Sequence, residues 1–215
     1  MNELETHVLQ LIGEDPDSPD VFLDTDDGMA PIRDSLNDAI EEIAIVTGSV
    51  KRTYILPLRI GTYFYRINMG SDKFAWVTDA WLVGIGRRLE QKDLQWLVDY
   101  NPRWMYNTGS PERYCPIGKD YICIHPAPSS DTDMLELTVV VSPDRYKTDD
   151  QRIKLRDEFH WAAVHYAVGE YWAGRGDAAT AKTHHGIYIK KLGIIELYPE
   201  TAERAWRYKT EKTVQ

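Results

Sequence analysis

The chain has 215 residues, of which 43% are hydrophobic and 27% are charged. This balance is typical of a globular protein and excludes a largely disordered chain or a fibrous repeat. No run of about 18 apolar residues is present, so we expect no membrane-spanning helix. Only two cysteines occur, Cys115 and Cys123, which excludes a disulfide-stapled scaffold and fits a reducing compartment.

The formal net charge of −9 is unevenly distributed along the chain. Residues 1–42 contain thirteen Asp or Glu and one basic residue, Arg33, whereas residues 43–215 contain 21 acidic and 24 basic residues. Tight, sequence-specific nucleic-acid binding needs a dense basic face, so this distribution disfavours it. A protein that surrounds nucleic acid without gripping it stays compatible with the charge.

The N-terminal part predicts two helices separated by an acidic linker. Residues 2–12 place apolar side chains at helical spacing and are followed by a glycine. Residues 14–28 are acidic and interrupted by two prolines, so we expect an exposed linker there. Pro31 suits the first turn of a second helix, which runs to Thr47 and has a glycine just past its end.

The middle of the chain changes to short segments rich in Tyr, Thr, Val and Ile, separated by Gly, Pro, Asn and Ser. This pattern predicts antiparallel strands within 53–58, 62–68, 74–89, 112–117, 120–125 and 135–141. A tight turn expected at 118–119 would place Cys115 and Cys123 on neighbouring strands. Residues 91–100 predict a short helix that ends before an Asn-Pro pair.

The last third returns to helix. Residues 148–151 fit a capping box, so we expect a long helix from there to about Trp172. Asp177 caps a further helix that ends at 190–192, with Gly193 after it. The expected fold is therefore α+β: a four-helix bundle with an antiparallel β module inserted between helices two and three, plus an extended C-terminal arm. The corresponding boundaries are 1–50 and 148–193 for the bundle, 51–147 for the β module and 194–215 for the arm.

No pattern in the sequence predicts an active site, a cofactor site or a metal site. His160 and His165 are five residues apart, whereas two ligands on one helix face need a spacing of three or four. The acidic segment 24–28 lacks the closing glutamate of a calcium loop. An enzyme whose site is assembled from distant residues such as Asp157, His160 and His184 stays open as an alternative.

The helix expected from residue 148 to about Trp172 is rich in aromatic residues. Trp161 and Trp172 fall off its main apolar face, so this helix is apolar nearly all round and must be covered on several sides. Either the β module or a neighbouring subunit would cover it. We therefore take Trp161, Tyr171 and Trp172 as candidate subunit-interface residues.

Several segments follow one another in a recognisable order. They are LNDAIEEI at 36–43, GTYFY at 61–65, Trp104 followed by GSPERY at 109–114, IHPAP at 124–128, and EFH at 158–160 leading through Tyr166-Ala167 and Tyr171 to Gly176-Asp177. This order, over about residues 30–193, resembles the head-to-tail adaptor proteins of tailed bacteriophages, also called head completion or tail tubular proteins. The segments are structural rather than catalytic signatures.

The resemblance implies a structural virion protein that catalyses no reaction. Such adaptors form a ring under the portal, commonly a dodecamer, which connects the capsid to the tail and extends the DNA channel. The implied partners are the portal protein, a downstream tail protein and double-stranded DNA that passes through without sequence-specific binding, with no membrane. The implied location is the virion, and the host cytoplasm during assembly. A carbohydrate-contacting or other virion β protein, whose surface Trp and Tyr would stack on sugars, stays open as an alternative.

The tail from Ile194 to Gln215 begins with apolar residues and ends with basic ones, which is unusual for an inert linker. Two interpretations are open: a strap that packs on its own bundle, or an arm that becomes ordered on a neighbour. The resemblance favours an arm that binds the portal. Its predicted portal-binding residues combine aromatic anchors with arginines for charge pairing: Tyr198, Arg204, Trp206, Arg207 and Tyr208.

Overall fold

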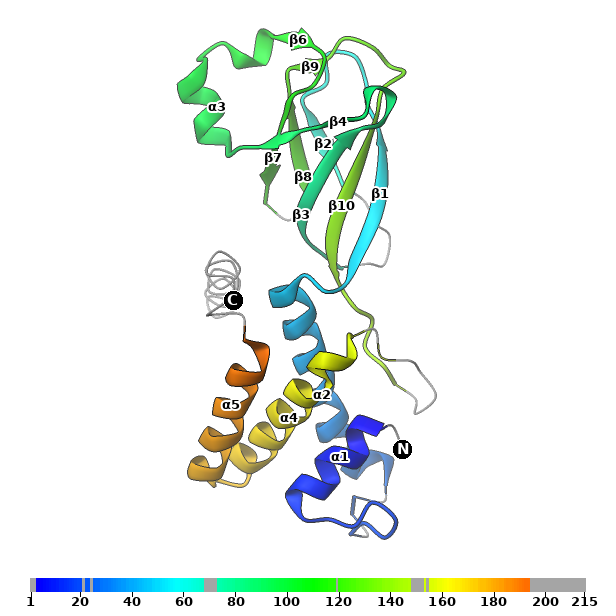
Figure 1. The fold of residues 1–215 in the computed structure, drawn as a ribbon, viewed down its shortest axis with the longest axis vertical. Coiled ribbons are helices and arrows are strands. Elements are labelled where there is room, and N and C mark those ends of the chain that lie inside the picture. The colour runs from blue at the N-terminus through cyan, green and yellow to red at the C-terminus, as the bar shows by residue number, and fades with distance from the viewer. Residues whose placement is uncertain are drawn as a thin grey trace. The chain divides into compact units, whose positions relative to one another are not determined.

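A computed structural model describes residues 3–20, 22–23, 25–67, 73–118, 120–147, 153 and 155–193. The chain divides into two compact units. The helical unit contains residues 1–50 and 143–215, and the β unit contains residues 51–142. The β unit is thus an insertion into the sequence of the helical unit (Figure 1).

The helical unit is built around one central helix, α4 (His160–Gly174). Helices α1 (Glu3–Ile12), α2 (Asp26–Thr47) and α5 (Ala178–Leu192) all pack against α4. The buried residues of α4 are small or β-branched, which lets its neighbours approach closely: Ala162, Ala163, Val164, Ala167, Val168 and Gly169. Because three helices cover it, α4 can be apolar around most of its circumference.

Helix α2 begins earlier than the sequence predicts. The hydroxyl of Thr25 accepts a hydrogen bond from the Gly28 N–H at 3.0 Å, and the helix begins at Asp26. Pro31 therefore lies inside the helix and not in its first turn, and the expected linker is shorter than 14–28. The cap at Thr25 favours a helix start strongly enough to outweigh the proline signal.

The long helix expected from 148 is wrong over its first part. The capping-box residues 148–151 lie outside the described residues. Arg156 is extended, and Asp157–Phe159 form the 3-10 turn η3 before α4 begins at His160. Leu155 is buried in the helical core, so a tertiary contact, and not helical periodicity, sets the path of the chain here.

Two buried polar contacts join distant segments of the helical unit. Glu5 on α1 is fully buried and accepts a hydrogen bond from Nε of Arg33 on α2 at 2.7 Å. The side-chain amide of Asn37 bonds both to the N–H and to the carbonyl of Tyr146, each at 3.0 Å. The second contact holds the chain on α2 where it re-enters the helical unit after the β unit.

The described residues of the β unit form two four-stranded sheets and one separate strand pair. The first sheet has the order β1 (Lys51–Pro57), β10 (Met134–Ser142), β3 (Lys73–Leu82), β4 (Arg87–Arg88). The second has the order β2 (Phe64–Arg66), β8 (Tyr121–His125), β7 (Arg113–Ile117), β5 (Glu90–Gln91). The separate pair is β6 (Thr108–Gly109) with β9 (Ala127–Pro128). Helix α3 (Leu94–Tyr100) follows β5 in the chain.

The fold is therefore α+β with mainly antiparallel sheets. The expected strand at 74–89 ends at Leu82, where the 3-10 turn η1 (Val83–Ile85) and Gly86 at φ 61° lead the chain back into β4. The pairs β5–β7 and β6–β9 are parallel, which local turn signals could not predict. Cys115 and Cys123 are cross-strand partners on β7 and β8, as the sequence predicts.

Candidate functional site

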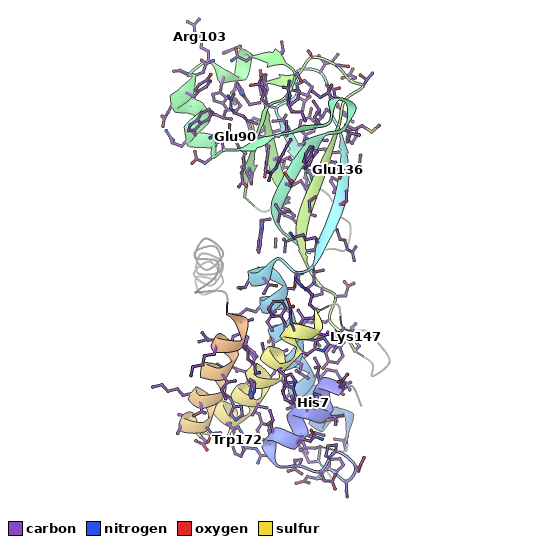
Figure 2. The ribbon with its side chains drawn as sticks, viewed as in Figure 1. His7, Glu90, Arg103, Glu136, Lys147 and Trp172 are labelled. Carbon is purple, nitrogen blue, oxygen red and sulfur yellow. The ribbon has the colours of Figure 1, made fainter. Side chains whose placement is uncertain are left out.

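The candidate subunit-interface residues all lie on α4 in the helical unit. Trp161 is 43% exposed and stacks on His7 of α1, with ring centroids 4.6 Å apart. Trp172 is partly buried against the helical core (Figure 2), and its ring meets that of Tyr171 edge-on at 5.4 Å. Trp161 is thus the most exposed of the three, and their role at an interface stays a prediction.

A histidine pair joins α4 to α5 beside Trp161. Nδ1 of His165 lies 3.1 Å from Nδ1 of His184. One of these nitrogens must donate and the other accept, so the contact breaks when both carry a proton. Burial lowers the pKa of both residues, and nearby positive charge adds to it: His184 acts on His165, and His185 acts on His184.

The residues of the enzyme alternative do not come together. Nε2 of His160 lies 3.8 Å from Oδ1 of Asp157, which is too far for a hydrogen bond, and His184 pairs with His165 instead. Within the described parts of the chain, no group of three or more His, Cys, Asp or Glu side chains could hold a metal ion. Among the same residues, no helix is long and apolar enough to cross a membrane.

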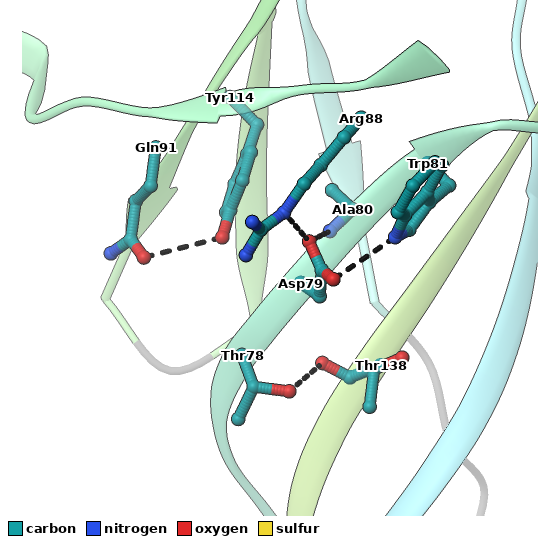
Figure 3. A network of polar contacts seen from close by, with 8 residues as sticks. All are labelled: Thr78, Asp79, Ala80, Trp81, Arg88, Gln91, Tyr114 and Thr138. Atoms are coloured by element: carbon teal, nitrogen blue, oxygen red, sulfur yellow. Dashed lines mark hydrogen bonds and ion pairs between the residues drawn. The ribbon is translucent and has the colours of Figure 1, made fainter. Parts of the chain in front are cut away.

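The β unit presents a tryptophan that hydrogen bonds hold in place on its first sheet (Figure 3). Asp79 accepts hydrogen bonds from Nε of Arg88 at 2.8 Å and from Nε1 of Trp81 at 2.9 Å. Burial alone would raise the pKa of Asp79, but the hydrogen bonds from Arg88, Trp81 and the Ala80 N–H outweigh it and lower the pKa. The Trp81 indole, 40% exposed, is therefore held by a carboxylate that stays ionised at neutral pH.

Exposed apolar side chains surround Trp81. Ile55 on β1 and Trp81 on β3 are both cross-strand partners of Glu136 on β10, so they lie on one face of the sheet. Of these three residues, Glu136 is labelled in Figure 2. We define the Trp81 patch as the apolar residues of this face and of the turn after β3, each at least 40% exposed: Ile55, Trp81, Val83, Ile85 and Met134. Sequence reasoning missed this patch, because apolar residues in a strand indicate an outward face only when the strand's partners are known.

A second aromatic group, partly buried and partly exposed, lies around α3. The rings of Trp96 and Tyr100 stack with centroids 4.8 Å apart, and the guanidinium of Arg113 lies 5.2 Å from the first ring and 5.3 Å from the second. Tyr106, in the 3-10 turn η2 (Trp104–Tyr106), is 84% exposed. Aromatic and arginine side chains of this kind are enriched at protein interfaces.

The two cysteines are buried free thiols in the β unit. Burial, with a smaller effect of Asp93, raises the pKa of Cys115 to about 11. Burial, with a smaller effect of Cys115, raises the pKa of Cys123 to about 12. At neutral pH both side chains are therefore protonated, and they act as packing groups and not as nucleophiles.

Exposed aromatic and arginine side chains in the β unit are therefore suited to contact with other proteins. The sequence model of the SU10 adaptor protein family matches residues 2–211. Because this match spans nearly the whole chain, the chain belongs to the SU10 adaptor protein family. The match supports the predicted resemblance to phage head-to-tail adaptors and, with it, a structural role in the virion. Among curated proteins, none matched the chain.

The predicted portal-binding residues lie outside the described residues. They are Tyr198, Arg204, Trp206, Arg207 and Tyr208. All five fall within the span of the family match, and their role stays a prediction from the sequence.

Proposed function

We propose that the chain forms a ring beneath the portal, connects the capsid to the tail and extends the DNA channel. The observation that carries this proposal is the match to the SU10 adaptor protein family, which includes both compact units. The ring would be a closed, cyclic homo-oligomer, with a dodecamer as the expected form. In such a ring one pair of complementary surfaces is repeated until the rotation closes.

In this proposal the four helices act as a bundle that builds the ring, and the inserted β module and the C-terminal arm reach the portal and the downstream tail protein. The Trp81 patch favours a docking role for the β module. A side chain that is already held by hydrogen bonds loses little conformational freedom when it binds. Trp81, fixed by Asp79, meets that condition.

The charge pattern suits a channel through which DNA passes. Residues 51–142 contain eleven Lys or Arg and ten Asp or Glu, and the remainder of the chain contains fourteen and twenty-four. A protein that grips DNA needs an excess of basic residues to neutralise phosphates. We therefore expect double-stranded DNA to pass without sequence-specific binding.

Sedimentation of the purified chain, alone and mixed with its portal, tests the proposed ring. We expect the free chain to be monomeric or weakly associated, because its net charge of −9 opposes association. With portal it should form a stoichiometric complex at micromolar concentration and moderate salt. The absence of any such complex, or binding of the isolated chain to glycans instead, would remove the proposed function.

Deletion of residues 196–215 tests the proposed arm. The truncated chain should keep its melting temperature but no longer stay on portal-bearing capsids, because the aromatic anchors around Trp206 are gone. Normal capsid binding by the truncated chain contradicts the arm. Unfolding of the truncated chain also contradicts it and favours a strap that packs on its own bundle.

A further inference from the structure

Charge is segregated within the helical unit. The acidic flank consists of exposed carboxylates on α1 and the segment after it: Glu3, Asp15, Asp17 and Asp20. The basic flank consists of exposed ammonium groups on α5, a helix without any Asp or Glu: Lys182, Lys190 and Lys191. Both flanks belong to one compact unit, so its own packing fixes how they lie relative to each other.

The two flanks face away from each other. Helices α1 and α5 each pack against α4, and α4 lies between them (Figure 1). A row of rings crosses the same three helices, from His7 on α1 through Trp161 and His165 on α4 to His184 on α5. The outer surfaces of α1 and α5 are therefore on opposite sides of the helical unit.

Charge of one sign continues along each flank. Helices α1 and α5 run in opposite directions (Figure 1). Glu3 lies in the first turn of α1, and Asp17 follows the end of that helix. Lys182 lies near the start of α5, and Lys190 lies near its end. Each flank therefore carries charge of one sign at both ends of its helix.

The outer surface of α5 is suited to close contact. Its exposed or half-exposed residues recur at helical spacing and are mostly small or basic: Ala179, Lys182, Thr183, Gly186, Ile189 and Lys190. A Cβ added to Gly186 would meet nothing within 4 Å, so this part of the surface is open. Ile189 is 51% exposed among the lysines and supplies apolar area. Small residues with one apolar side chain allow another surface to approach the helix backbone closely.

We propose that the acidic flank of one copy docks on the basic flank of the next copy, head to tail around the ring. This inference rests on the proposed ring and adds the surfaces that build it. A head-to-tail contact uses two different surfaces of the same chain, and opposite charge on those surfaces is what it requires. A two-fold dimer through either flank would place like charges against each other. The charge pattern therefore favours rings over dimers.

The strength of this contact follows from its exposure. Solvent-exposed ion pairs contribute little individually and are screened by salt. Free chains should therefore associate weakly, whereas a portal that holds many copies near one another raises their effective concentration and completes the ring. Weak association without portal is thus a property that the flanks themselves explain.

The test uses the full chain with the charge of one flank reversed at a time. The acidic-flank variant carries Glu3→Lys, Asp15→Lys, Asp17→Lys and Asp20→Lys. The basic-flank variant carries Lys182→Glu, Lys190→Glu and Lys191→Glu. A fourth protein carries all seven changes. Self-association is measured by sedimentation velocity at low and high salt, and circular dichroism checks that each variant keeps its helices. Each single-flank variant should self-associate at least about tenfold more weakly than the native chain.

An equimolar mixture of the two variants should restore association, because every contact again joins an acidic to a basic flank, and high salt should weaken it. The protein with all seven changes should associate alone. A matched control, Arg59→Glu with Arg103→Glu, changes two exposed charges in the β unit (Arg103 is labelled in Figure 2) and should behave like the native chain. Native-like association of a folded single-flank variant, or no association in the mixture, would overturn the proposal.

Capture of the native chain on portal is measured separately, so the two proposals can fail independently. If the mixture associates but portal does not capture the native chain, the flank contact stands and the portal-bound ring is wrong. If portal captures the native chain but the mixture does not associate, the ring stands and the flank contact is wrong.

Discussion

The helical unit and the β unit differ in what they expose. The helical unit carries the net negative charge of the chain and separates an acidic flank from a basic one. The β unit is nearly neutral and exposes apolar and aromatic side chains, in the Trp81 patch and around α3. The first kind of surface acts over longer distances and is sensitive to salt. The second acts only on contact and depends on shape.

The chain thereby separates two kinds of assembly contact into two units. Weak, screened charge contacts suit copies that must stay apart until a template gathers them. Rigid aromatic contacts suit a partner that is bound once and kept.

Replacing Arg33 with alanine should have the largest effect, and only on the helical unit. The Glu5 side chain is 1% exposed, and Arg33→Ala leaves this carboxylate without its guanidinium. Removal of one partner from a buried ion pair typically costs about 3–5 kcal/mol in the free energy of unfolding. Urea unfolding followed by far-ultraviolet circular dichroism measures this loss. The matched control, Glu5→Gln with Arg33→Met, should lose less, and native stability in Arg33→Ala would contradict the account.

Replacing His125 with leucine should stabilise the β unit by about 1 kcal/mol at neutral pH. His125 is 2% exposed and, within the described part of the chain, neither ring nitrogen has a hydrogen-bond partner. Burial, with a smaller effect of Arg113, lowers the pKa of His125 below 6.5. Below pH 6.5 the His125 imidazole binds a proton in the unfolded chain but stays neutral in the folded chain until the pH is lower. The free energy of unfolding of the native protein therefore decreases as the pH falls below 6.5. The gain from leucine should grow in that range, and lower stability of the variant at every pH would contradict this.

Replacing Asp79 with asparagine should lower the free energy of unfolding of the β unit only slightly at neutral pH, because the charge-assisted bond that is lost comes from the exposed side chain of Arg88. The pKa of Asp79 is lowered on folding. The Asp79 carboxylate therefore stabilises the β unit fully above pH 3.8, the ordinary pKa of an aspartate. This stabilisation disappears as the pH falls through the lower pKa of the folded state. Acid unfolding of the native and variant proteins should converge at low pH. A difference that persists in acid would show that the side chain acts through its shape alone.

Replacing His184 with glutamine should have the smallest effect, well below about 1 kcal/mol at neutral pH, because the amide can still bond to His165. The pKa values of both histidines are lowered on folding. The native helical unit therefore loses stability as pH falls from 6.5 toward the folded pKa values. The variant should show a shallower loss between about pH 7 and pH 5. His160→Gln is the matched control, and an unchanged pH profile in His184→Gln would contradict the paired arrangement.

The sequence predicts features of the fold that local chemistry determines. Asp177 caps α5 through a hydrogen bond from the Thr180 N–H, and Gly193 ends that helix at φ 58°, both as expected. The cross-strand position of Cys115 and Cys123 follows from the short turn between their strands. In each case a few neighbouring residues decide the conformation.

Features that depend on distant residues could not be predicted in this way. The path before α4 is set by the burial of Leu155, and the parallel pairs of β5 and β6 need partners far along the chain. The Trp81 patch could not be predicted from the sequence, because its residues come together only through the pairing of β1, β3 and β10. The candidate interface residues of α4 were found because aromatic crowding is local, but their exposure is set by α1, as His7 against Trp161 illustrates.

Cryo-electron microscopy of the native chain bound to its portal would test the proposed ring and its flank contacts together. We expect a closed ring of copies around an open channel, in which the acidic flank near Asp17 of each copy faces the basic flank near Lys182 of the next. Separate copies on the portal without contact between neighbours, or no bound density at all, would contradict it.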